Sequence, residues 1–250
     1  MSDYFFSIIT CTYNSDKYLQ DNIDSLKFQI FKNFEHIFID GNSTDKTIDI
    51  LNRYQSENSN VKIIQAEPRG IANAMNIGIK NAQGKYLLFL NSDDFLNNEN
   101  SLQNVFNFIK ENPKYNWYYG IVDTITENKK YLYSYPHRMY QKIFCYWIFR
   151  FTFFMQHPAT FYSRELFDKY GLYDETLNAM DYEYAIRIGK KEKAKFMNMK
   201  VSNFRLGGIS TTQSDRLEKE VKKIFKKYFS FSGFWFLIRR FYIKIFVKKL

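Results

Sequence analysis

The stretch LLFLNSDDFL, residues 87–96, joins a continuous apolar run to two adjacent carboxylates. Such a run is typical of a strand covered on both faces. Asn91, Ser92, Asp93 and Asp94 follow at the point where this strand has to leave the core. Two like charges side by side repel, and neither is favourable to bury without a partner. A solvated turn is one explanation, because Asn, Ser and Asp are common turn residues.

The sequence before this stretch alternates between strand and helix patterns. Short β-rich apolar runs occur at residues 5–10, 35–40, 61–66 and 85–90, and segments with helical spacing of apolar residues occur at 15–31, 43–55 and 70–84. This alternation predicts parallel strands with helices on both faces of the sheet. Ser15 is the expected N-cap of the first helix, Ser43 or Thr44 opens the second, and Gly84 closes the third.

After Phe95 the pattern changes to a mixture of helices and strands. We expect helices at residues 99–112 and 180–191, strands at 115–136 and 194–204, and a strand-to-helix unit at 157–175. Residues 1–213 are expected to form one domain, with a nucleotide-side half at 1–95 and an acceptor-side half at 96–213. A basic amphipathic helical tail is expected at residues 214–250.

Polar residues gather where the four early strands end. The segments are TCTYN at residues 10–14, DGNSTD at 40–45, AEPRG at 66–70 and NSDD at 91–94. The carboxyl ends of parallel strands meet at one edge of a sheet, which is where ligands bind in such folds. The sequence therefore predicts a polar pocket there. It contains no GxGxxG and no GxxxxGK[ST] segment, which argues against a dinucleotide oxidoreductase and a P-loop NTPase.

The positive charge is concentrated at the C-terminus. Residues 216–250 contain 11 Lys and Arg and two Glu, a net charge of +9, whereas the whole chain carries +10. This asymmetry indicates a local anionic partner for the tail and argues against a nucleic-acid-binding protein. The sequence shows neither a signal peptide nor an apolar run long enough to span a bilayer. We therefore expect a cytoplasmic catalytic part.

Five ordered segments together resemble the family 2 glycosyltransferases, which have the GT-A fold. They are SIITCTYN, FIDGNSTDKT, EPRGIANAMNIGIKNAQGKYLLFLNSDD, HPATFYSRELFDKYGLYDE and AMDYEYAIRIG. The resemblance covers about residues 4–212 and is greatest to the branch that builds bacterial surface polysaccharides. It implies a mixed α/β sheet flanked by helices and an inverting transfer of a sugar from a nucleotide diphosphate, expected to be UDP, to a lipid-linked or saccharide hydroxyl.

The resemblance also explains the acidic pair. NSDD matches the Asp-x-Asp segment of the family, with Asn91 in the first acidic position. Asp93 is the first candidate metal ligand and Asp94 the second. A divalent cation held by carboxylates stabilises the charge of a departing diphosphate, and Mg²⁺ and Mn²⁺ both suit oxygen ligands.

The resemblance assigns further residues to the donor and acceptor sides. Expected around the nucleotide-sugar are Thr10, Tyr13, Asn14, Asp40, Arg69, Asn91 and Ser92. Tyr13 is expected to stack on the base, and Arg69 to meet the diphosphate or to be a solvated loop charge. Asp181 matches the family's general base, with Glu183 as the alternate. His157 is expected either to line the acceptor side or to be a packed core residue.

The tail combines aromatic and basic residues. Arg240, Lys244 and Lys248 recur at every fourth position between Phe, Trp and Ile side chains. This pattern suits a helix in an anionic membrane interface and predicts a peripheral protein on the inner face of the cytoplasmic membrane. Docking on the domain or on a second subunit is the alternative. The alternatives for the function are a non-catalytic nucleotide-sugar-binding protein and, with less support, a nucleotidyltransferase.

Overall fold

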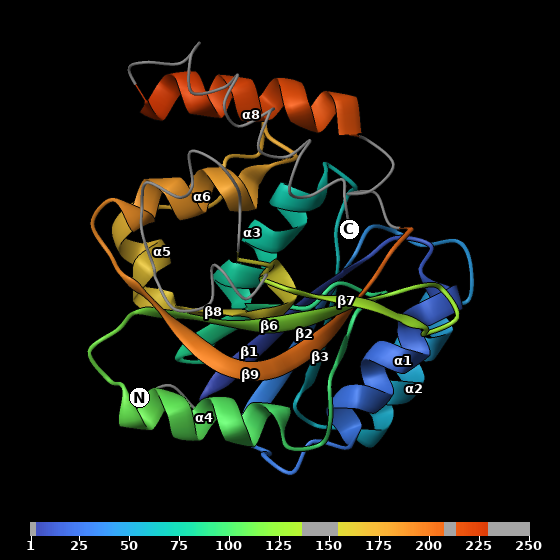
Figure 1. The fold of residues 1–250 in the computed structure, drawn as a ribbon. Coiled ribbons are helices and arrows are strands. Elements are labelled where there is room, and N and C mark those ends of the chain that lie inside the picture. Colours follow the sequence, from blue (N-terminus) through green and yellow to red (C-terminus); the bar gives the residue numbers. More distant parts are fainter. Residues whose placement is uncertain (1–3, 137–154, 208–213, 230–250) are drawn as a thin grey trace.

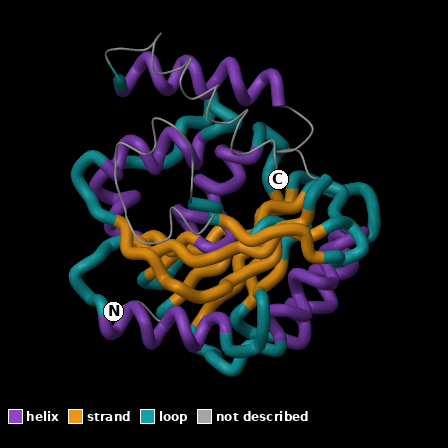
Figure 2. The backbone as a smooth tube through the Cα atoms, in the orientation of Figure 1, coloured by secondary structure: helices purple, strands orange, loops and turns teal. Residues whose placement is uncertain are grey.

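The computed structural model of the protein describes residues 4–136, 155–207 and 214–229. Helices cover both faces of a central sheet, as the tube view in Figure 2 shows. Within the described residues the sheet has nine strands. Eight follow the order β3-β2-β1-β4-β8-β6-β9-β5, and β7 pairs with the C-terminal part of β6. The mixed sheet flanked by helices that the resemblance implies is confirmed.

The first half of the chain forms the parallel part of the sheet. Its strands are β1 (Phe6–Thr12), β2 (Phe34–Asp40), β3 (Val61–Gln65) and β4 (Tyr86–Phe89). Helices α1 (Asp16–Lys27), α2 (Thr47–Glu57) and α3 (Ile71–Asn81) connect them. β1 pairs in parallel with both β2 and β4, and β2 pairs in parallel with β3. The loops after these strands therefore meet at one edge, as the alternation predicted.

The second half adds strands of mixed direction. They are β5 (Phe95–Leu96), β6 (Trp117–Ile125), β7 (Tyr131–Tyr135), β8 (Thr160–Ser163) and β9 (Ala194–Arg205). β8 pairs antiparallel with β4 and β6, and β9 runs parallel to β6 and antiparallel to β5. The short pairing of β5 with β9 brings the end of the acidic turn beside the end of β9.

The helices form a layer on each face of the sheet (Figure 1). α1, α2 and α4 (Ser101–Glu111) lie on one face, and α3, α5 (Arg164–Tyr170) and α6 (Met180–Gly189) lie on the other. Leu87 and Phe89 of β4 point into the core under α3, α5 and α6, whereas Leu88 packs into the core under α4. This confirms that the apolar run 87–90 is buried on both faces.

Several helix ends differ from the expectation. α1 ends at Lys27, three residues before Ile30, whose side chain is 55% exposed. Ser15 precedes α1 without a side-chain cap, because its hydroxyl accepts a hydrogen bond from Tyr13 N–H instead. Neither Ser43 nor Thr44 opens α2, which starts at Thr47. These short polar residues bind neighbouring loops, and such tertiary contacts compete with local capping.

The helix that follows the domain boundary expected at residue 213 packs on the core. Helix α8 (Ser214–Tyr228) lies beside α6 on the side away from the sheet (Figure 1). Ile224, Phe225 and Phe229 are at most 3% exposed and join the same core cluster as Met180. The remainder of the expected tail, with Arg240, Lys244 and Lys248, lies outside the described residues. Among the described helices, none is long and apolar enough to cross a membrane.

Candidate active site

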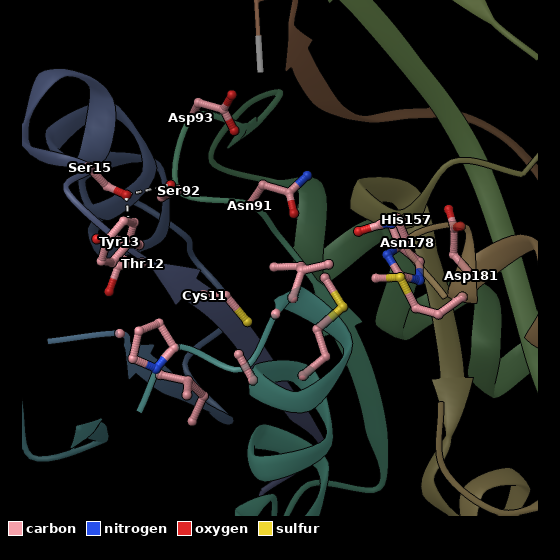
Figure 3. Close-up of a pocket in the computed structure, with 18 of the residues that line it drawn as sticks. Cys11, Thr12, Tyr13, Ser15, Asn91, Ser92, Asp93, His157, Asn178 and Asp181 are labelled. Carbon is pink, nitrogen blue, oxygen red and sulfur yellow. Dashed lines mark hydrogen bonds between the residues drawn. The ribbon is translucent and has the colours of Figure 1, made fainter. Parts of the chain in front are cut away.

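A cavity of about 920 Å³ lies beyond the carboxyl ends of the parallel strands. All four polar loops predicted from the sequence contribute to its wall, through Tyr13, Gly41, Arg69 and Asp93 among others. The opposite wall comes from α3 and from the segment Asn178–Tyr182 at the start of α6. In Figure 3, Tyr13 and Ser15 lie on one side, His157 and Asp181 on the other, and Asn91 between them.

The loop after β1 presents Tyr13 and Asn14 to the cavity. The Tyr13 side chain is 61% exposed and lies against Gly41, where an added Cβ would be 3.1 Å from Tyr13 Cδ2. Asn14 has a positive φ of 48°, and its side-chain oxygen accepts the Thr44 N–H at 2.9 Å. Ser92 Oγ donates to Ser15 Oγ at 3.1 Å, which ties this loop to the acidic turn. The exposed ring is thus free to stack on a planar base.

Thr10 and Asp40 lie behind the cavity wall. Thr10 is fully buried and donates to Leu90 O at 2.7 Å. The Asp40 carboxylate is fully buried and accepts hydrogen bonds from Thr12 Oγ1, Ser43 N and Ser43 Oγ at 2.6–2.9 Å. Neither residue is part of the cavity lining. The structure therefore favours roles for them in holding the loops, and it does not support the expected contact with nucleotide.

The two acids of the turn differ in their surroundings. Asp93 is partly exposed and lines the cavity together with Asn91 and Ser92 (Figure 3). Asp94 is fully buried, and its carboxylate accepts hydrogen bonds from Arg205 N–H at 3.0 Å and from Asn91 Nδ2 at 2.9 Å. Asp94 does not line the cavity, so the geometry favours Asp93 as the ligand and Asp94 as a residue that shapes the turn.

Arg205, at the end of β9, holds the acidic turn in place. Its buried guanidinium donates to Asp93 O at 3.2 Å, to Glu127 O at 2.5 Å and to Asp21 Oδ2 at 2.6 Å. It also lies 4.2 Å from the ring centroid of Tyr18. No local sequence signal marks this residue, because its partners are brought together only when β9 pairs with β5 and β6.

Burial raises the pKa of both acids. For Asp93 the main cause is loss of solvent, and the Arg205 charge opposes it. For Asp94 loss of solvent comes first and the neighbouring Asp93 charge adds to it, while the Arg205 N–H and the Asn91 amide oppose the rise. A carboxylate with a raised pKa gains from a nearby cation. The pair is therefore suited to a bound positive charge on the cavity side.

The residues fit a divalent cation, although the site is not preassembled. Among the described residues there is no group of three or more His, Cys, Asp or Glu side chains arranged to hold a metal. The Asp93 carboxylate accepts no hydrogen bond from another described residue. Its two oxygens are ligands of the kind that Mg²⁺ or Mn²⁺ binds. Such cations keep several waters and bind through one or two carboxylates plus substrate phosphates. One available carboxylate is thus compatible with a metal that arrives with a diphosphate.

Asp181 and His157 lie together on the other side of the cavity (Figure 3). Asp181 is the second residue of α6, and its Oδ1 accepts the Tyr182 N–H at 2.8 Å. His157 is buried, stacks on Phe89 with ring centroids 5.1 Å apart, and bonds Tyr173 Oη through Nε2 at 3.1 Å. Burial lowers the pKa of His157 despite the opposing Asp181 charge, so the imidazole stays neutral. His157 is both packed in the core and part of the lining.

Glu183, the alternate base, faces away from the cavity. Its carboxylate is buried and pairs with Arg187 at 2.8 Å, and Tyr228 Oη of α8 donates to it. It is not part of the lining. The geometry therefore favours Asp181 over Glu183. Arg69 is exposed and lines the cavity.

Other lining residues were not among the site residues expected from the sequence. Asn178 and Met180 precede Asp181 and line the same wall, and Val221 of α8 joins them. Cys11 lines the floor, where burial raises the pKa of its thiol to about 12 and keeps it protonated. Asn178 and Val221 are far apart in sequence, and only the docking of α8 on α6 brings them to one wall.

Known structures share this fold. Two crystal structures of Staphylococcus aureus TarS residues 1–349 are similar, one of them in complex with UDP-GlcNAc, with a TM-score of 0.72 over 96% of this chain and 73% of that one at 20% identity. A mannosyltransferase from Pyrobaculum calidifontis in complex with GDP-Man and Mn²⁺ gives a TM-score of 0.69 over 97% and 70% of the two chains at 17% identity. The fold is that of GT-A glycosyltransferases.

The sequence comparisons identify the family. The model of "Glycosyl transferase family 2" matches residues 7–171, and this chain belongs to that family. A PGL/p-HBAD biosynthesis glycosyltransferase of Mycobacterium bovis is 30% identical over 223 residues, which cover 86% of this chain and 83% of that protein. The poly(ribitol-phosphate) β-N-acetylglucosaminyltransferase TarS of Staphylococcus aureus is 38% identical over 110 residues, which cover 42% of this chain and 19% of that protein. The protein is a glycosyltransferase.

Proposed function

We propose that the protein is an inverting glycosyltransferase that moves a sugar from a nucleotide diphosphate, with UDP as the first candidate, to a hydroxyl of a surface-glycan precursor. The observation that carries the proposal is the placement of Asp93 and Asp181 on different walls of one cavity. The first faces the site expected for the diphosphate, and the second faces the site expected for the acceptor. The neighbour with UDP-GlcNAc supports a nucleotide-sugar donor.

The proposed reaction is a single displacement. The Asp181 carboxylate takes the proton from the acceptor hydroxyl, whose oxygen forms the new bond to C1 of the sugar. The bond between C1 and the diphosphate oxygen breaks on the opposite face, and the nucleoside diphosphate leaves with the electron pair. His157 is neutral and hydrogen-bonded to Tyr173, so it is not placed as the base; we assign it to packing beside the acceptor.

We assign the donor side to the loops on the other part of the cavity. Tyr13 offers an exposed ring for the base, and Asn14, Asn91 and Ser92 offer polar groups beside it. Arg69 is placed to meet the diphosphate. Asp93 would hold a divalent cation, which supplies electrostatic stabilisation for the charge that develops on the leaving diphosphate.

We place the acceptor on a lipid carrier at the inner face of the cytoplasmic membrane. α8 supports this placement, because it borders the cavity through Val221 and presents exposed Lys219, Lys222, Lys223 and Lys226 on its outer face. The PGL/p-HBAD relative supports a role in making cell-surface glycolipids or polysaccharides.

The test of this proposal is a donor screen followed by one variant. UDP-GlcNAc, UDP-glucose, UDP-galactose and GDP-mannose are each incubated with the full chain and Mn²⁺ or Mg²⁺, and release of the nucleoside diphosphate is measured with water as the acceptor. Asp181→Asn should keep its affinity for UDP and lose roughly 10²–10⁴-fold in turnover, the range for a positioned acid–base group. Glu183→Gln serves as the second variant. Near-normal turnover of Asp181→Asn would show that the base has been assigned wrongly.

A further inference from the structure

Helix α8 contacts the backbone that carries the proposed base. The Glu220 carboxylate is 8% exposed and accepts three hydrogen bonds from the turn before α6. Its Oε2 accepts Asn178 N–H at 2.7 Å and Ala179 N–H at 3.0 Å, and its Oε1 accepts Asn178 Nδ2 at 2.6 Å. Asp181 follows two residues later. One carboxylate on a helix 42 residues further along the chain thus accepts a hydrogen bond from both the backbone and the side-chain nitrogen of Asn178.

These contacts lie directly before the first turn of α6. Ala179 is the residue before the first turn of α6 and has no side chain that can accept a hydrogen bond, so α6 lacks a side-chain cap of its own. The first N–H groups of a helix have no partner within the helix. A carboxylate near that end is also favoured by the helix dipole. Glu220 therefore holds the backbone at the N-cap residue Ala179 and at Asn178 just before it, from a helix outside α6.

The rest of α8 fixes the position of Glu220. Ile224 and Phe225 are buried against the α6 side of the core, and Tyr228 Oη donates to Glu183. Val221, the next residue after Glu220, lines the cavity beside Asn178 and Asp181. α8 is thus held at two points along α6, and Val221 near its N-terminal end reaches the cavity wall.

We infer that Glu220 is a positioning residue. Through its hydrogen bonds to Asn178 and Ala179 it fixes the position of Asp181 on the acceptor side, so α8 contributes to the geometry of the active site. This inference rests on the proposed role of Asp181. Small displacements of a reacting group cost large factors in rate, about 10²-fold for about 1 Å. A change at Glu220 should therefore lower kcat and leave donor binding intact, since among the described residues no hydrogen bond or ion pair joins the donor-side loops to α8.

The first measurement is hydrogen–deuterium exchange on the full chain, and it needs no substrate. Glu220→Gln has one side-chain oxygen in place of two and brings an amide group toward backbone donors. Peptides that cover residues 173–182 should exchange at least tenfold faster than in the unmodified chain, and peptides of the β1–α1 loop should not change. Lys219→Gln, on the outer face of the same helix, is the matched control. Unchanged exchange at residues 173–182 in Glu220→Gln would overturn the inference.

The second measurement is a double-mutant cycle on UDP-GlcNAc hydrolysis, or on the donor of the same panel that is hydrolysed fastest. Glu220→Gln should lower kcat by at least tenfold with KM and the Kd for UDP within twofold of the unmodified chain. If Glu220 acts through Asp181, adding Glu220→Gln to Asp181→Asn causes no further loss. Multiplied losses, or a rise in KM alone, would overturn the inference.

The two measurements separate failure of the inference from failure of the proposed function. Faster exchange in Glu220→Gln together with normal turnover of Asp181→Asn would remove Asp181 as the base while Glu220 still positions the turn. If Glu220→Gln does not fold, Glu220→Asp is used in its place. Asp keeps the charge and both acceptor oxygens, but its side chain is shorter by one methylene group. It should show a smaller loss of kcat in the same cycle, and full kcat in that variant would also overturn the inference.

Discussion

Asp93 and Asp94 are adjacent, yet the hydrogen bonds around them give them different tasks. The Asp94 carboxylate is occupied by Arg205 N–H and Asn91 Nδ2, whereas the Asp93 carboxylate lines the cavity. A sequence pattern cannot distinguish the two, because both stand where the strand ends. The difference arises from Arg205 on β9, which is 111 residues away from Asp94.

The two acids should respond differently to replacement by Asn. Asp93→Asn should leave the melting temperature unchanged or raise it, because it removes a partly buried charge with a raised pKa. Turnover with Mn²⁺ should fall about 10²-fold or more, since metal-held charge stabilisation is worth several kcal/mol. Calorimetric titration of UDP with and without Mn²⁺ checks the cause. If the metal strengthens UDP binding equally in the variant, Asp93 is not the ligand.

Asp94→Asn should mainly lower the free energy of unfolding. An amide has only one acceptor oxygen, so either Arg205 N–H or Asn91 Nδ2 loses its partner inside the protein. An unsatisfied buried donor costs about 1–3 kcal/mol, which urea denaturation can resolve. A variant as stable as the unmodified chain would show that the buried carboxylate is protonated in the folded state.

His36 gives the fold a pH dependence that is independent of the active site. Burial lowers its pKa from 6.5 to about 3. Thr10 Oγ1 donates to Leu90 O and therefore accepts from His36 Nε2 at 3.0 Å, which leaves Nδ1 without a hydrogen bond in the described structure. Below pH 6.5 the unfolded chain takes up a proton that the folded chain refuses.

The free energy of unfolding should therefore fall by about 1.4 kcal/mol between about pH 7.5 and 5.5 through His36 alone. His36→Gln keeps a donor toward Thr10 and has no titrating ring, so its stability should fall less over this range. Urea denaturation of both proteins across the range measures the difference, in which the shared contribution of His157 cancels. Parallel pH curves would mean that His36 is protonated in the fold.

At the scale of elements, Gly84 and Gly78 allow the chain around them to pack closely against β1. A Cβ at Gly84 would lie 2.5 Å from Ser7 N and 2.6 Å from Phe6 C, both backbone atoms of β1. A Cβ at Gly78 of α3 would lie 2.5 Å from Cγ2 of Ile9, a side chain. The sequence marked Gly84 as a helix end, but its contact with β1 gives a stronger reason for glycine.

Gly84→Ala should therefore destabilise the fold more than Gly78→Ala. Overpacking typically costs about 1–3 kcal/mol, and Gly78→Ala should stay within that range because Ile9 can adjust and because Ala favours the helix. Gly84→Ala meets a backbone that cannot move without disturbing β1 and should exceed it. Urea denaturation of the two variants side by side provides the comparison. A smaller loss for Gly84→Ala would show that β1 yields more easily than its pairing indicates.

Local pattern predicted the elements of the first half of the chain, but it gave no strand order for the second half. The apolar runs of β1–β4 are clear in the sequence and are joined by short helices. Short connections with right-handed crossovers then leave one arrangement of these strands, a parallel sheet. β8 and β6 fit between β4 and β9 through pairings with no counterpart in local sequence. The same limit applies to the site, where Tyr13, Asp93 and Asp181 follow motifs but Arg205 and Glu220 act through contacts more than 40 residues away.

At the scale of the whole molecule, charge and cavity lie on the same side. α8 lies on the far side of α6 from the sheet, and α4 lies at the opposite end of the molecule (Figure 1). The docked face of α8 carries Glu220, Ile224 and Phe225, and the outer face carries exposed lysines. The +9 charge of residues 216–250 thus begins on a surface next to the acceptor side of the cavity.

We expect this surface to bind anionic membranes, with the rest of the tail adding to it. Basic residues near an anionic surface contribute about 1 kcal/mol each. Replacing four lysines of the outer face in the full chain should weaken co-sedimentation with phosphatidylglycerol-containing vesicles at least tenfold, and added salt should weaken it further. The variant is Lys219→Gln, Lys222→Gln, Lys223→Gln and Lys226→Gln. Lys227 is left in place because it lies 3.8 Å from Glu183.

A control variant with the same change in net charge tests whether vesicle binding depends on where the lysines lie. It replaces four exposed lysines at the end of the molecule near α4, namely Lys32→Gln, Lys85→Gln, Lys110→Gln and Lys114→Gln. Because screening confines the attraction to about 10 Å at 0.1 M salt, these distant charges should contribute little once α8 faces the bilayer. Affinity for UDP should be unchanged in both variants. Equal weakening by the two sets would reduce the effect to net charge, and binding equal to that of the unmodified chain in the α8 variant would remove this helix as the membrane-facing surface.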